Sequence, residues 1–215
     1  ALSRALRLIS TLAAYLAFGL VGALLALVLP LALLRLPAGL AGERRARRIV
    51  ALIWTGYLTA MRWGGIYRVT WHGRERLGRP GQLILVNHPS LMDVLFMISA
   101  VPEGNCVVKA SLLTNPSMRP AIRACGYIPN DASLELIEKT AAVLAEGQTL
   151  ILFPEGTRTG YDGIIRLNRG AVSIGLRGAS VITPVVIRMT PPGLKRGDPW
   201  YKIPPRPYHY DIRVG

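Results

Sequence analysis

Cysteine, histidine and acidic side chains are all scarce in this chain of 215 residues. It has 2 cysteines and 3 histidines, and 26 Lys and Arg residues against 12 Asp and Glu residues give a formal net charge of +14. Two cysteines form one disulfide at most, so disulfide-rich secreted folds are excluded and buried, reduced thiols are expected. No group of His and Cys has the spacing of a metal site, so no metal is expected.

The excess of positive charge predicts an anionic partner, but its pattern does not fit nucleic acid. The arginines are not gathered in a zinc module, an aromatic-rich RNA-binding sheet or a recognition helix, so we expect no nucleic acid partner. Hydrophobic residues make up 51% of the chain, which is too many for a disordered protein. Membrane lipids with an anionic surface account for both the charge and the hydrophobic residues.

A long hydrophobic run near the N-terminus predicts a membrane anchor. Residues 12–34 contain no charged side chain, and a helix of that length, at about 1.5 Å per residue, could cross a hydrocarbon core about 30 Å thick. Pro30 and Pro37 can end the helix early, and a partly amphipathic segment follows at 49–61. Two arrangements stay open, a spanning helix and a helical pair that lies in one leaflet. The run is long for a signal peptide.

Four arginines follow the hydrophobic run closely: Arg44, Arg45, Arg47 and Arg48. Only Arg4 and Arg7 precede it, so the positive-inside tendency puts the following domain at the cytoplasmic face of a bacterial-type inner membrane. We expect the four arginines to contact anionic headgroups.

A candidate general base follows the apolar residues 83–86, which are expected to form a buried strand. Pro89 favours a turn after His88, because proline forces the preceding residue out of the α region. Asp93 could then hold one ring nitrogen of His88 while the other takes a proton from a hydroxyl group. Two alternatives involve Ser90: a helix cap formed with Asp93, and the nucleophile of a hydrolase, for which the Gly-x-Ser-x-Gly turn is missing.

A candidate anion-binding turn, with the sequence Phe-Pro-Glu-Gly-Thr-Arg at 153–158, follows a second apolar segment at 150–152. Gly156 lets the backbone approach a ligand, the N–H groups of a turn can face an anion, and Arg158 can bind phosphate through two nitrogens. A surface turn with an ion pair is the alternative. In open α/β sheets, active sites form where such strands end.

Taken together and in this order, the two segments resemble the signature motifs of the 1-acylglycerol-3-phosphate acyltransferases, a family within the glycerolipid acyltransferases. Those motifs are His-x4-Asp and a later Phe-Pro-Glu-Gly-Thr-Arg, and the resemblance covers about residues 67–188. A third block matches in part at 126–132, where Ala132 stands in place of a family arginine that helps to hold the acceptor's phosphate. A fourth block, a proline among β-branched residues, matches at Pro184.

The resemblance implies an α/β fold with a mixed sheet flanked by helices. It also implies transfer of a fatty acyl group from acyl-CoA or acyl-carrier protein to a lysophospholipid hydroxyl, with 1-acylglycerol-3-phosphate as the acceptor and phosphatidic acid as the product. The thioester is a co-substrate, so we expect no bound cofactor and no covalent enzyme intermediate. Because of Ala132, another lyso-acceptor or a hydroxylated polar lipid stays open. A non-catalytic lipid-binding membrane protein is the remaining alternative.

The resemblance also assigns the site residues. His88 and Asp93 are the expected catalytic pair. The residues expected to bind substrate are Asn87, Lys109, Glu155, Gly156, Thr157, Arg158 and Pro184. For Lys109, a solvated lysine at a strand end is the alternative.

The chain divides into membrane-anchoring helices at 1–63 and a catalytic domain at 64–215. The expected strands of that domain are 67–71, 83–86, 106–109, 149–153, 181–187 and, at an edge, 208–214, with a brief extended piece at 127–129. The expected helices are 90–100, 116–124, 131–145 with Ser133 as N-cap, and 168–176. Aromatic residues after Pro191 could rest on headgroups or simply pack: Trp200, Tyr201, Tyr208 and Tyr210.

Overall fold

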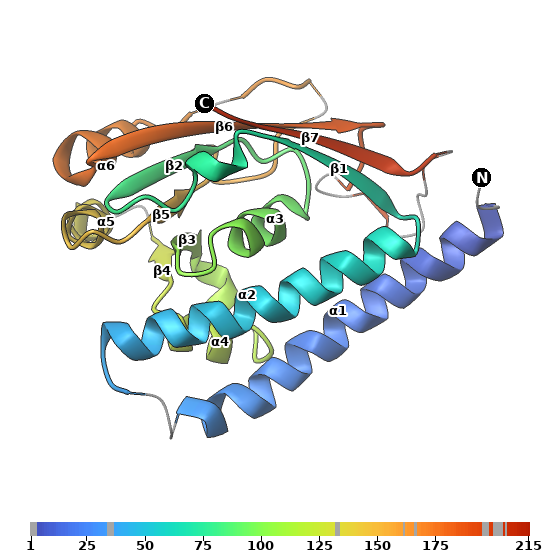
Figure 1. Cartoon of the computed structure of the whole chain (residues 1–215), viewed down its shortest axis with the longest axis horizontal. Helices are drawn as coiled ribbons and strands as arrows, with labels where there is room; N and C mark the ends of the chain where they lie inside the picture. Colours follow the sequence, from blue (N-terminus) through green and yellow to red (C-terminus); the bar gives the residue numbers. More distant parts are fainter. Residues whose placement is uncertain are drawn as a thin grey trace.

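A computed structural model of the chain describes residues 4–33, 37–131, 134–160, 162–165, 167–194, 198–199, 204 and 206–215. It begins with two long helices, α1 (Arg4–Leu33) and α2 (Leu40–Trp63), which run side by side in opposite directions (Figure 1). Within the described residues, one segment, Leu6–Val28 of α1, is long and apolar enough to cross a membrane.

One mixed sheet of seven strands forms the centre of the rest of the molecule (Figure 1). The strands are β1 (Tyr67–His72), β2 (Gln82–Val86), β3 (Asn105–Lys109), β4 (Ile128–Asn130), β5 (Leu150–Leu152), β6 (Val181–Thr190) and β7 (Tyr208–Val214). Their order is β1-β7-β6-β2-β5-β3-β4. The strands β6, β2, β5, β3 and β4 run parallel, and β7 is antiparallel to β6 and parallel to β1.

The two faces of the sheet have separate hydrophobic cores, because alternate residues of each strand point to opposite faces. The helices α2, α3 (Asp93–Ala100) and α4 (Arg119–Ala124) cover one face, and α1 packs on α2 and α4. The helices α5 (Leu134–Ala145) and α6 (Gly170–Gly178) cover the other face. Short 3₁₀ turns lie at Arg74–Arg76 and Ala110–Thr114. The predicted α/β class, with a mixed sheet flanked by helices, is confirmed.

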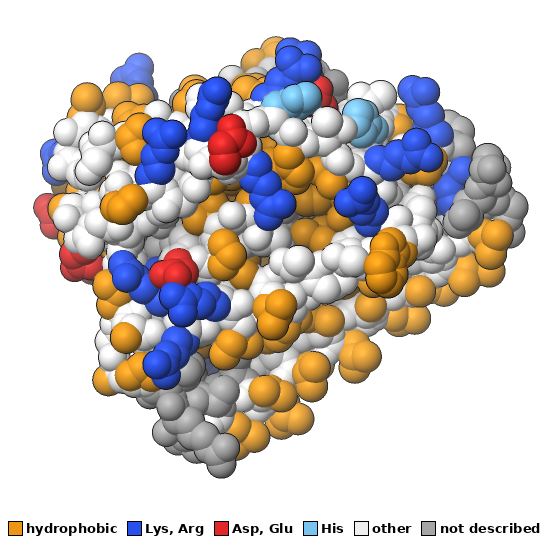
Figure 2. Space-filling view, viewed as in Figure 1, with side chains coloured by type: hydrophobic (Ala, Val, Ile, Leu, Met, Phe, Trp, Pro, Cys, Tyr) orange, Lys and Arg blue, Asp and Glu red, His pale blue; other side chains and the backbone are white. Residues whose placement is uncertain are grey.

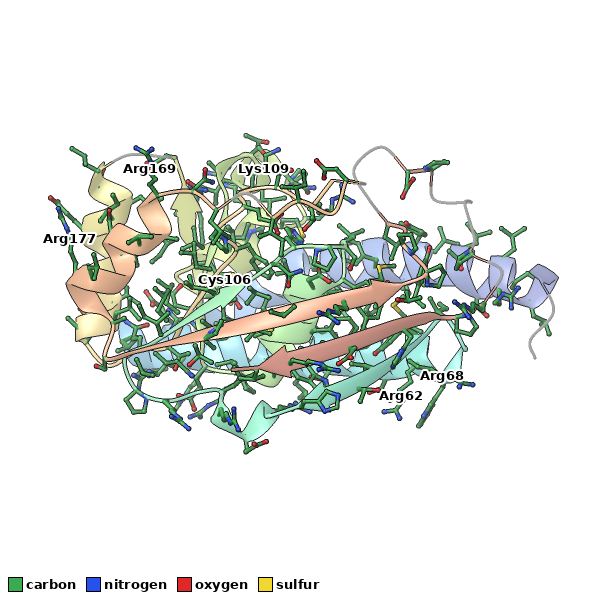
Figure 3. The ribbon with its side chains drawn as sticks, turned by 90° about the horizontal axis from the view of Figure 1, so that it is seen from above. Arg62, Arg68, Cys106, Lys109, Arg169 and Arg177 are labelled. Carbon is green, nitrogen blue, oxygen red and sulfur yellow. The ribbon has the colours of Figure 1, made fainter. Side chains whose placement is uncertain are left out.

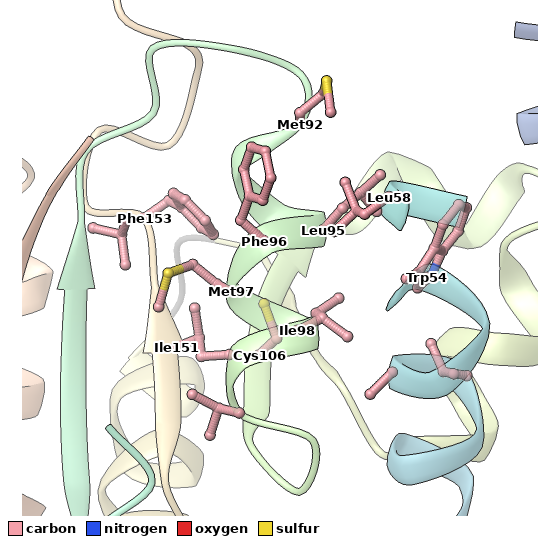
Figure 4. Packing of buried hydrophobic residues seen from close by; sticks show 14 of the residues in the cluster. Trp54, Leu58, Met92, Leu95, Phe96, Met97, Ile98, Cys106, Ile151 and Phe153 are labelled. Atoms are coloured by element: carbon pink, nitrogen blue, oxygen red, sulfur yellow. The ribbon is translucent and has the colours of Figure 1, made fainter. Parts of the chain in front are cut away.

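Helix α3 packs between the sheet and α2 (Figure 4). Phe96, Met97 and Ile98 of α3 are buried, and so are Trp54 and Leu58 of α2. These side chains belong to one core together with residues of β2 and β5. The buried side of α2 thus shares the core of the sheet, and the division of the chain at residue 63 stays a prediction.

The predicted strands and helices lie close to where the sequence placed them, and the sheet shows one informative difference. The segment 208–214 is not an edge strand, because β7 pairs with both β1 and β6. An alternating pattern is the same for an edge strand and an interior one, so the sequence could not decide this. Tyr208 and Tyr210 are 5% and 0% exposed, so they pack in the core and do not rest on headgroups. Trp200, Tyr201, Ala132 and Ser133 lie outside the described residues.

Arg47 is the largest fully buried side chain. Its Nε donates to the carbonyl oxygen of Cys125 at 2.7 Å, and its Nη1 donates to Gln148 Oε1 at 2.8 Å and to the carbonyl oxygen of Glu103 at 3.2 Å. Its Nη2 bonds Glu43 Oε2 at 2.9 Å. Burial lowers the pKa of Arg47, and Glu43 opposes that shift. The prediction that Arg47 contacts headgroups is therefore wrong, because this side chain joins α2 to three other segments.

We expect Arg47→Ala to lower the free energy of unfolding by about 3 kcal/mol, since it leaves buried carbonyl and amide oxygens without a donor. Arg45→Ala is the matched control, because Arg45 is exposed on the same helix, and its effect should stay within about 0.5 kcal/mol. Thermal unfolding of both variants in the same detergent measures the difference. Equal melting temperatures for the two variants would contradict the structural role of Arg47.

Candidate active site

The carboxyl ends of three parallel strands bring several predicted site residues to one side of the sheet. His88 follows β2, Glu155 follows β5, and Lys109 is the last residue of β3. In the sheet order, β5 lies between β2 and β3. Because β2, β5 and β3 are neighbours and run parallel, these three positions lie on the same side of the sheet.

His88 and Asp93 are in direct contact. Nδ1 of His88 lies 3.0 Å from Oδ2 of Asp93, the first residue of α3. The side chain of Asp93 is fully buried and that of His88 is 17% exposed. The His88 ring also lies 4.7 Å from the ring of Phe153, between centroids. The contact through Nδ1 leaves Nε2 as the ring nitrogen that can face a substrate.

Ser90 holds the carboxylate of Asp93 from the other side. Its backbone N–H donates to Oδ2 at 2.6 Å, and its hydroxyl donates to Oδ1 at 2.7 Å. The buried hydroxyl of Tyr210, in β7, donates in turn to the Ser90 hydroxyl at 3.2 Å. Helix α3 starts at Asp93 and not at Ser90 as predicted, because residues 90–92 form the turn that brings the two side chains together.

Two opposing effects act on the pKa of Asp93. Burial raises it above the ordinary value of a carboxyl group, and the hydrogen bonds from His88 and Ser90 lower it. A buried carboxylate needs such donors to stay charged, because it has lost the stabilisation that water gives. Burial is the larger effect, so the pKa is raised on balance, and Ser90 is one of the donors that limit the rise.

Glu155 ties the second motif to the first. Its Oε1 accepts a hydrogen bond from the backbone N–H of His88 at 2.7 Å and another from the hydroxyl of Thr159 at 2.9 Å. The backbone N–H of Thr159 donates to the carbonyl oxygen of His88 at 2.7 Å. The backbone of His88 is thus held on both sides by residues 155–159. The hydrogen-bonding roles of Thr159 and Tyr210 were not predicted from the sequence, because no motif or spacing indicates either role.

The other predicted substrate-binding residues have different surroundings. The amide of Asn87 bonds both backbone groups of Ile187 in β6, at 3.0 and 2.7 Å. Arg158 Nη1 donates to the carbonyl oxygen of Leu194 at 2.8 Å. Gly156 (φ 66°) and Thr157 are exposed in the turn.

Lys109 is also exposed. Pro184 pairs in register with Leu85, on the sheet face that carries α6, whereas α3 and Asp93 lie on the opposite face. All these assignments stay predictions.

A cavity of about 190 Å³ lies next to the start of α3. Leu91 and Met92 line it from the turn between His88 and Asp93, and Phe18 of α1 and Tyr57 of α2 line it from the helical pair. Its walls are almost entirely apolar. In the part of the chain that the structure describes, no group of three or more His, Cys, Asp or Glu side chains could hold a metal ion.

Comparison with known proteins agrees with this arrangement. The family model named Acyltransferase matches residues 68–188, which is more than half of the chain. A 1-acyl-sn-glycerol-3-phosphate acyltransferase of Chlamydomonas reinhardtii is 24% identical over 67% of this chain and 45% of its own length. The enzyme of that name from Helicobacter pylori is 28% identical over 49% of this chain and 48% of its own length. The chain spans less than half the length of these relatives.

A solved structure has the same fold. It is the crystal structure of the 1-acyl-sn-glycerophosphate acyltransferase PlsC from Thermotoga maritima, with a TM-score of 0.75 and 18% identity over 97% of this chain and 84% of that one. At that identity the likeness establishes the fold alone, whereas the family model covers both motifs. The chain therefore belongs to the acyltransferase family, and its resemblance to the 1-acylglycerol-3-phosphate acyltransferases is confirmed.

Proposed function

We propose that the protein transfers a fatty acyl group from a thioester to the free hydroxyl of 1-acylglycerol-3-phosphate, at a membrane surface. The observation that carries the proposal is the contact between His88 and the buried Asp93, at a strand end that the second motif holds in place. The donor is acyl-CoA or acyl-carrier protein, as the resemblance implies.

In the proposed mechanism, Nε2 of His88 takes the proton of the acceptor hydroxyl while Nδ1–H donates to Asp93. The resulting alkoxide attacks the thioester carbonyl, the ester bond forms, and the carbon–sulfur bond breaks. The thiolate then leaves with the proton that His88 carries. Asp93 keeps the ring in one tautomer and stabilises the positive charge that forms on it. Because a thiolate is a good leaving group, positioning and one base suffice, without a covalent intermediate.

Arg158 and Lys109 are the proposed contacts for the acceptor's phosphate. The bond from Arg158 Nη1 to the carbonyl oxygen of Leu194 uses one of the five N–H donors of the guanidinium. Lys109 lies at the end of β3, two strands from β2. Glu155, by contrast, is proposed as a positioning residue for His88, because its Oε1 accepts from the His88 backbone and from Thr159.

The apolar cavity beside α3 is proposed to hold part of an acyl chain. It opens between the helical pair and the turn that carries the catalytic residues. Burial of a chain in apolar surroundings contributes about 0.8 kcal/mol per CH₂ group. A chain in this cavity would place its polar end beside His88.

We also propose that α1 lies in the plane of the membrane rather than across it. One side of α1 packs on the protein: the Phe18 ring lies 5.1 Å from that of Trp54, and the hydroxyl of Tyr57 donates to the carbonyl oxygen of Ala14 at 3.0 Å. The other side is a row of exposed hydrophobic side chains along the helix, including Leu12, Leu16, Leu20, Leu24, Leu27 and Leu31. A helix with one apolar side and one packed side fits one leaflet, at the cytoplasmic face.

We expect His88→Ala to lower acyl transfer by about 10²-fold or more, because the general base is lost. Asp93→Asn should fall by a similar factor, since an amide cannot hold the required tautomer or stabilise the charged ring. His72→Ala is the control, because His72 is an exposed histidine of β1. Initial rates with acyl-CoA and 1-acylglycerol-3-phosphate in detergent micelles measure the effect. An active His88→Ala enzyme would remove the base from the mechanism.

We expect Ser90→Ala to move the acidic limb of the kcat/KM–pH profile to higher pH. Asp93 acts as a carboxylate, and loss of the Ser90 hydroxyl removes a hydrogen bond that lowers its pKa. The pKa of Asp93 then rises, and protonation inactivates the variant at a higher pH than the wild type. At the optimum, kcat/KM should fall about 10-fold, as for loss of a hydrogen bond to a charged group.

Ser99→Ala is the control for this profile. It makes the same change within α3, the helix that follows Ser90, and the hydroxyl of Ser99 is buried without a hydrogen-bond partner in the structure. Its pH profile should match that of the wild type. If the wild type, Ser90→Ala and Ser99→Ala all have the same pH profile, the Ser90 hydroxyl does not influence the charge of Asp93.

We expect Arg158→Lys to raise the acceptor KM about 10-fold with a smaller effect on kcat, because lysine keeps the charge but loses the planar group that grips phosphate in two places. Arg177→Lys, an exposed position of α6, is the control.

Product mass spectrometry with a panel of lyso-acceptors tests the identity of the acceptor itself. If Ala132→Arg shifts preference toward 1-acylglycerol-3-phosphate from another lysolipid, the wild-type acceptor is that other lipid.

A further inference from the structure

A basic groove lies at the end of the molecule where α1 begins and α2 ends. Its volume is about 840 Å³, and its walls include Arg7 of α1, Arg62 of α2, Arg68 of β1 and Arg206. Figure 3 shows Arg62 and Arg68 close together, at the opposite end of the molecule from Arg177. None of the residues that line this groove belongs to the catalytic pair or to the second motif.

The groove is lined by side chains of one sign of charge. Its described lining holds four arginines and no Asp or Glu. Arg68 points away from the buried face of β1, on which Tyr67 packs into the core. His209, also in the groove, shares a hydrogen bond of 3.0 Å with the hydroxyl of Thr70. A concave surface lined with one sign of charge concentrates the electrostatic potential and favours an anion with several oxygen atoms.

The surroundings of the groove indicate which anion it meets. Trp63, next to Arg62, is 85% exposed, and Leu6 and Ile9, on either side of Arg7, are 52% and 63% exposed. Figure 2 shows the hydrophobic row of α1 along one side of the molecule, with Lys and Arg side chains gathered above it. Tryptophan and arginine beside an apolar helix are typical of the level at which lipid headgroups meet hydrocarbon.

We propose that this groove binds the phosphodiester headgroup of an anionic phospholipid in the membrane on which the protein lies. The proposal rests on the proposed membrane association. It also differs from the prediction for the arginines after the hydrophobic run, two of which have other contacts: Arg47 is buried and Arg48 is paired with Glu103. The two helices would place their apolar side in the leaflet, and the groove at their common end would select anionic lipid.

The test compares two double variants of the full chain. Arg62→Ala with Arg68→Ala removes two groove arginines. Arg79→Ala with Arg177→Ala removes two exposed arginines, one before β2 and one near the end of α6, and so makes the same change in net charge. Vesicles of phosphatidylcholine alone, and of phosphatidylcholine with phosphatidylglycerol, are the probes, in sedimentation at low and high salt.

We expect the groove variant to bind the phosphatidylglycerol vesicles about 30-fold more weakly than the wild type, since each arginine near an anionic surface contributes about 5-fold. The control variant should lose much less, and binding to phosphatidylcholine vesicles should be unchanged for both. High salt should reduce the difference between the two variants. The basal activity in detergent micelles should stay at the wild-type level, because neither arginine is in the catalytic machinery.

Equal losses in the two variants would overturn the proposal, because net charge alone would then explain binding. A groove variant that binds both vesicles normally but turns over acyl-carrier-protein thioesters more slowly would also overturn it, and would assign the groove to an acidic protein. If the wild type binds neither vesicle, the membrane association itself fails. If the wild type and the groove variant bind the vesicles equally well, the groove proposal alone fails.

Discussion

The hydrogen bond between the carboxylate of Glu155 and the backbone N–H of His88 is the contact on which the site depends. Together with the bond from the Thr159 backbone to the His88 carbonyl oxygen, it fastens the end of β5 to the end of β2. A catalytic side chain needs a fixed backbone, because small displacements of a reacting group are costly in rate. The two motifs therefore act as one unit, although 67 positions separate their partners.

The carboxyl group of Asp93 is held by a network of hydrogen bonds. Asp93 is fully buried, which favours the neutral acid, and His88 and both donors of Ser90 favour the carboxylate. Tyr210 extends this network into β7, a strand near the end of the chain. The fold thus supplies at Asp93 the hydrogen bonds that water supplies to an exposed carboxylate.

The basic residues illustrate how one kind of side chain has different functions in different places. The cluster after the hydrophobic run has the composition of a headgroup-binding segment. In the structure, Arg47 is buried and joins α2 by hydrogen bonds to Cys125, after α4, and to Gln148, before β5, and Arg48 pairs with Glu103. At the other end of the helical pair, Arg62 and Arg68, which are close in sequence, line one groove with Arg7 and Arg206 from the two ends of the chain.

The sequence by itself determined the α/β class, most of the strand and helix positions, the long apolar helix and the pairing of His88 with Asp93. These depend on hydrophobic periodicity and on two compact motifs, both of which are local in the chain. Tertiary structure decided which strand is the edge, which arginines are buried and where Ser90, Thr159 and Tyr210 act. Those outcomes depend on contacts between distant segments. The alternating pattern of a strand does not show which strands pair with it, and the type of a residue does not determine whether it is buried.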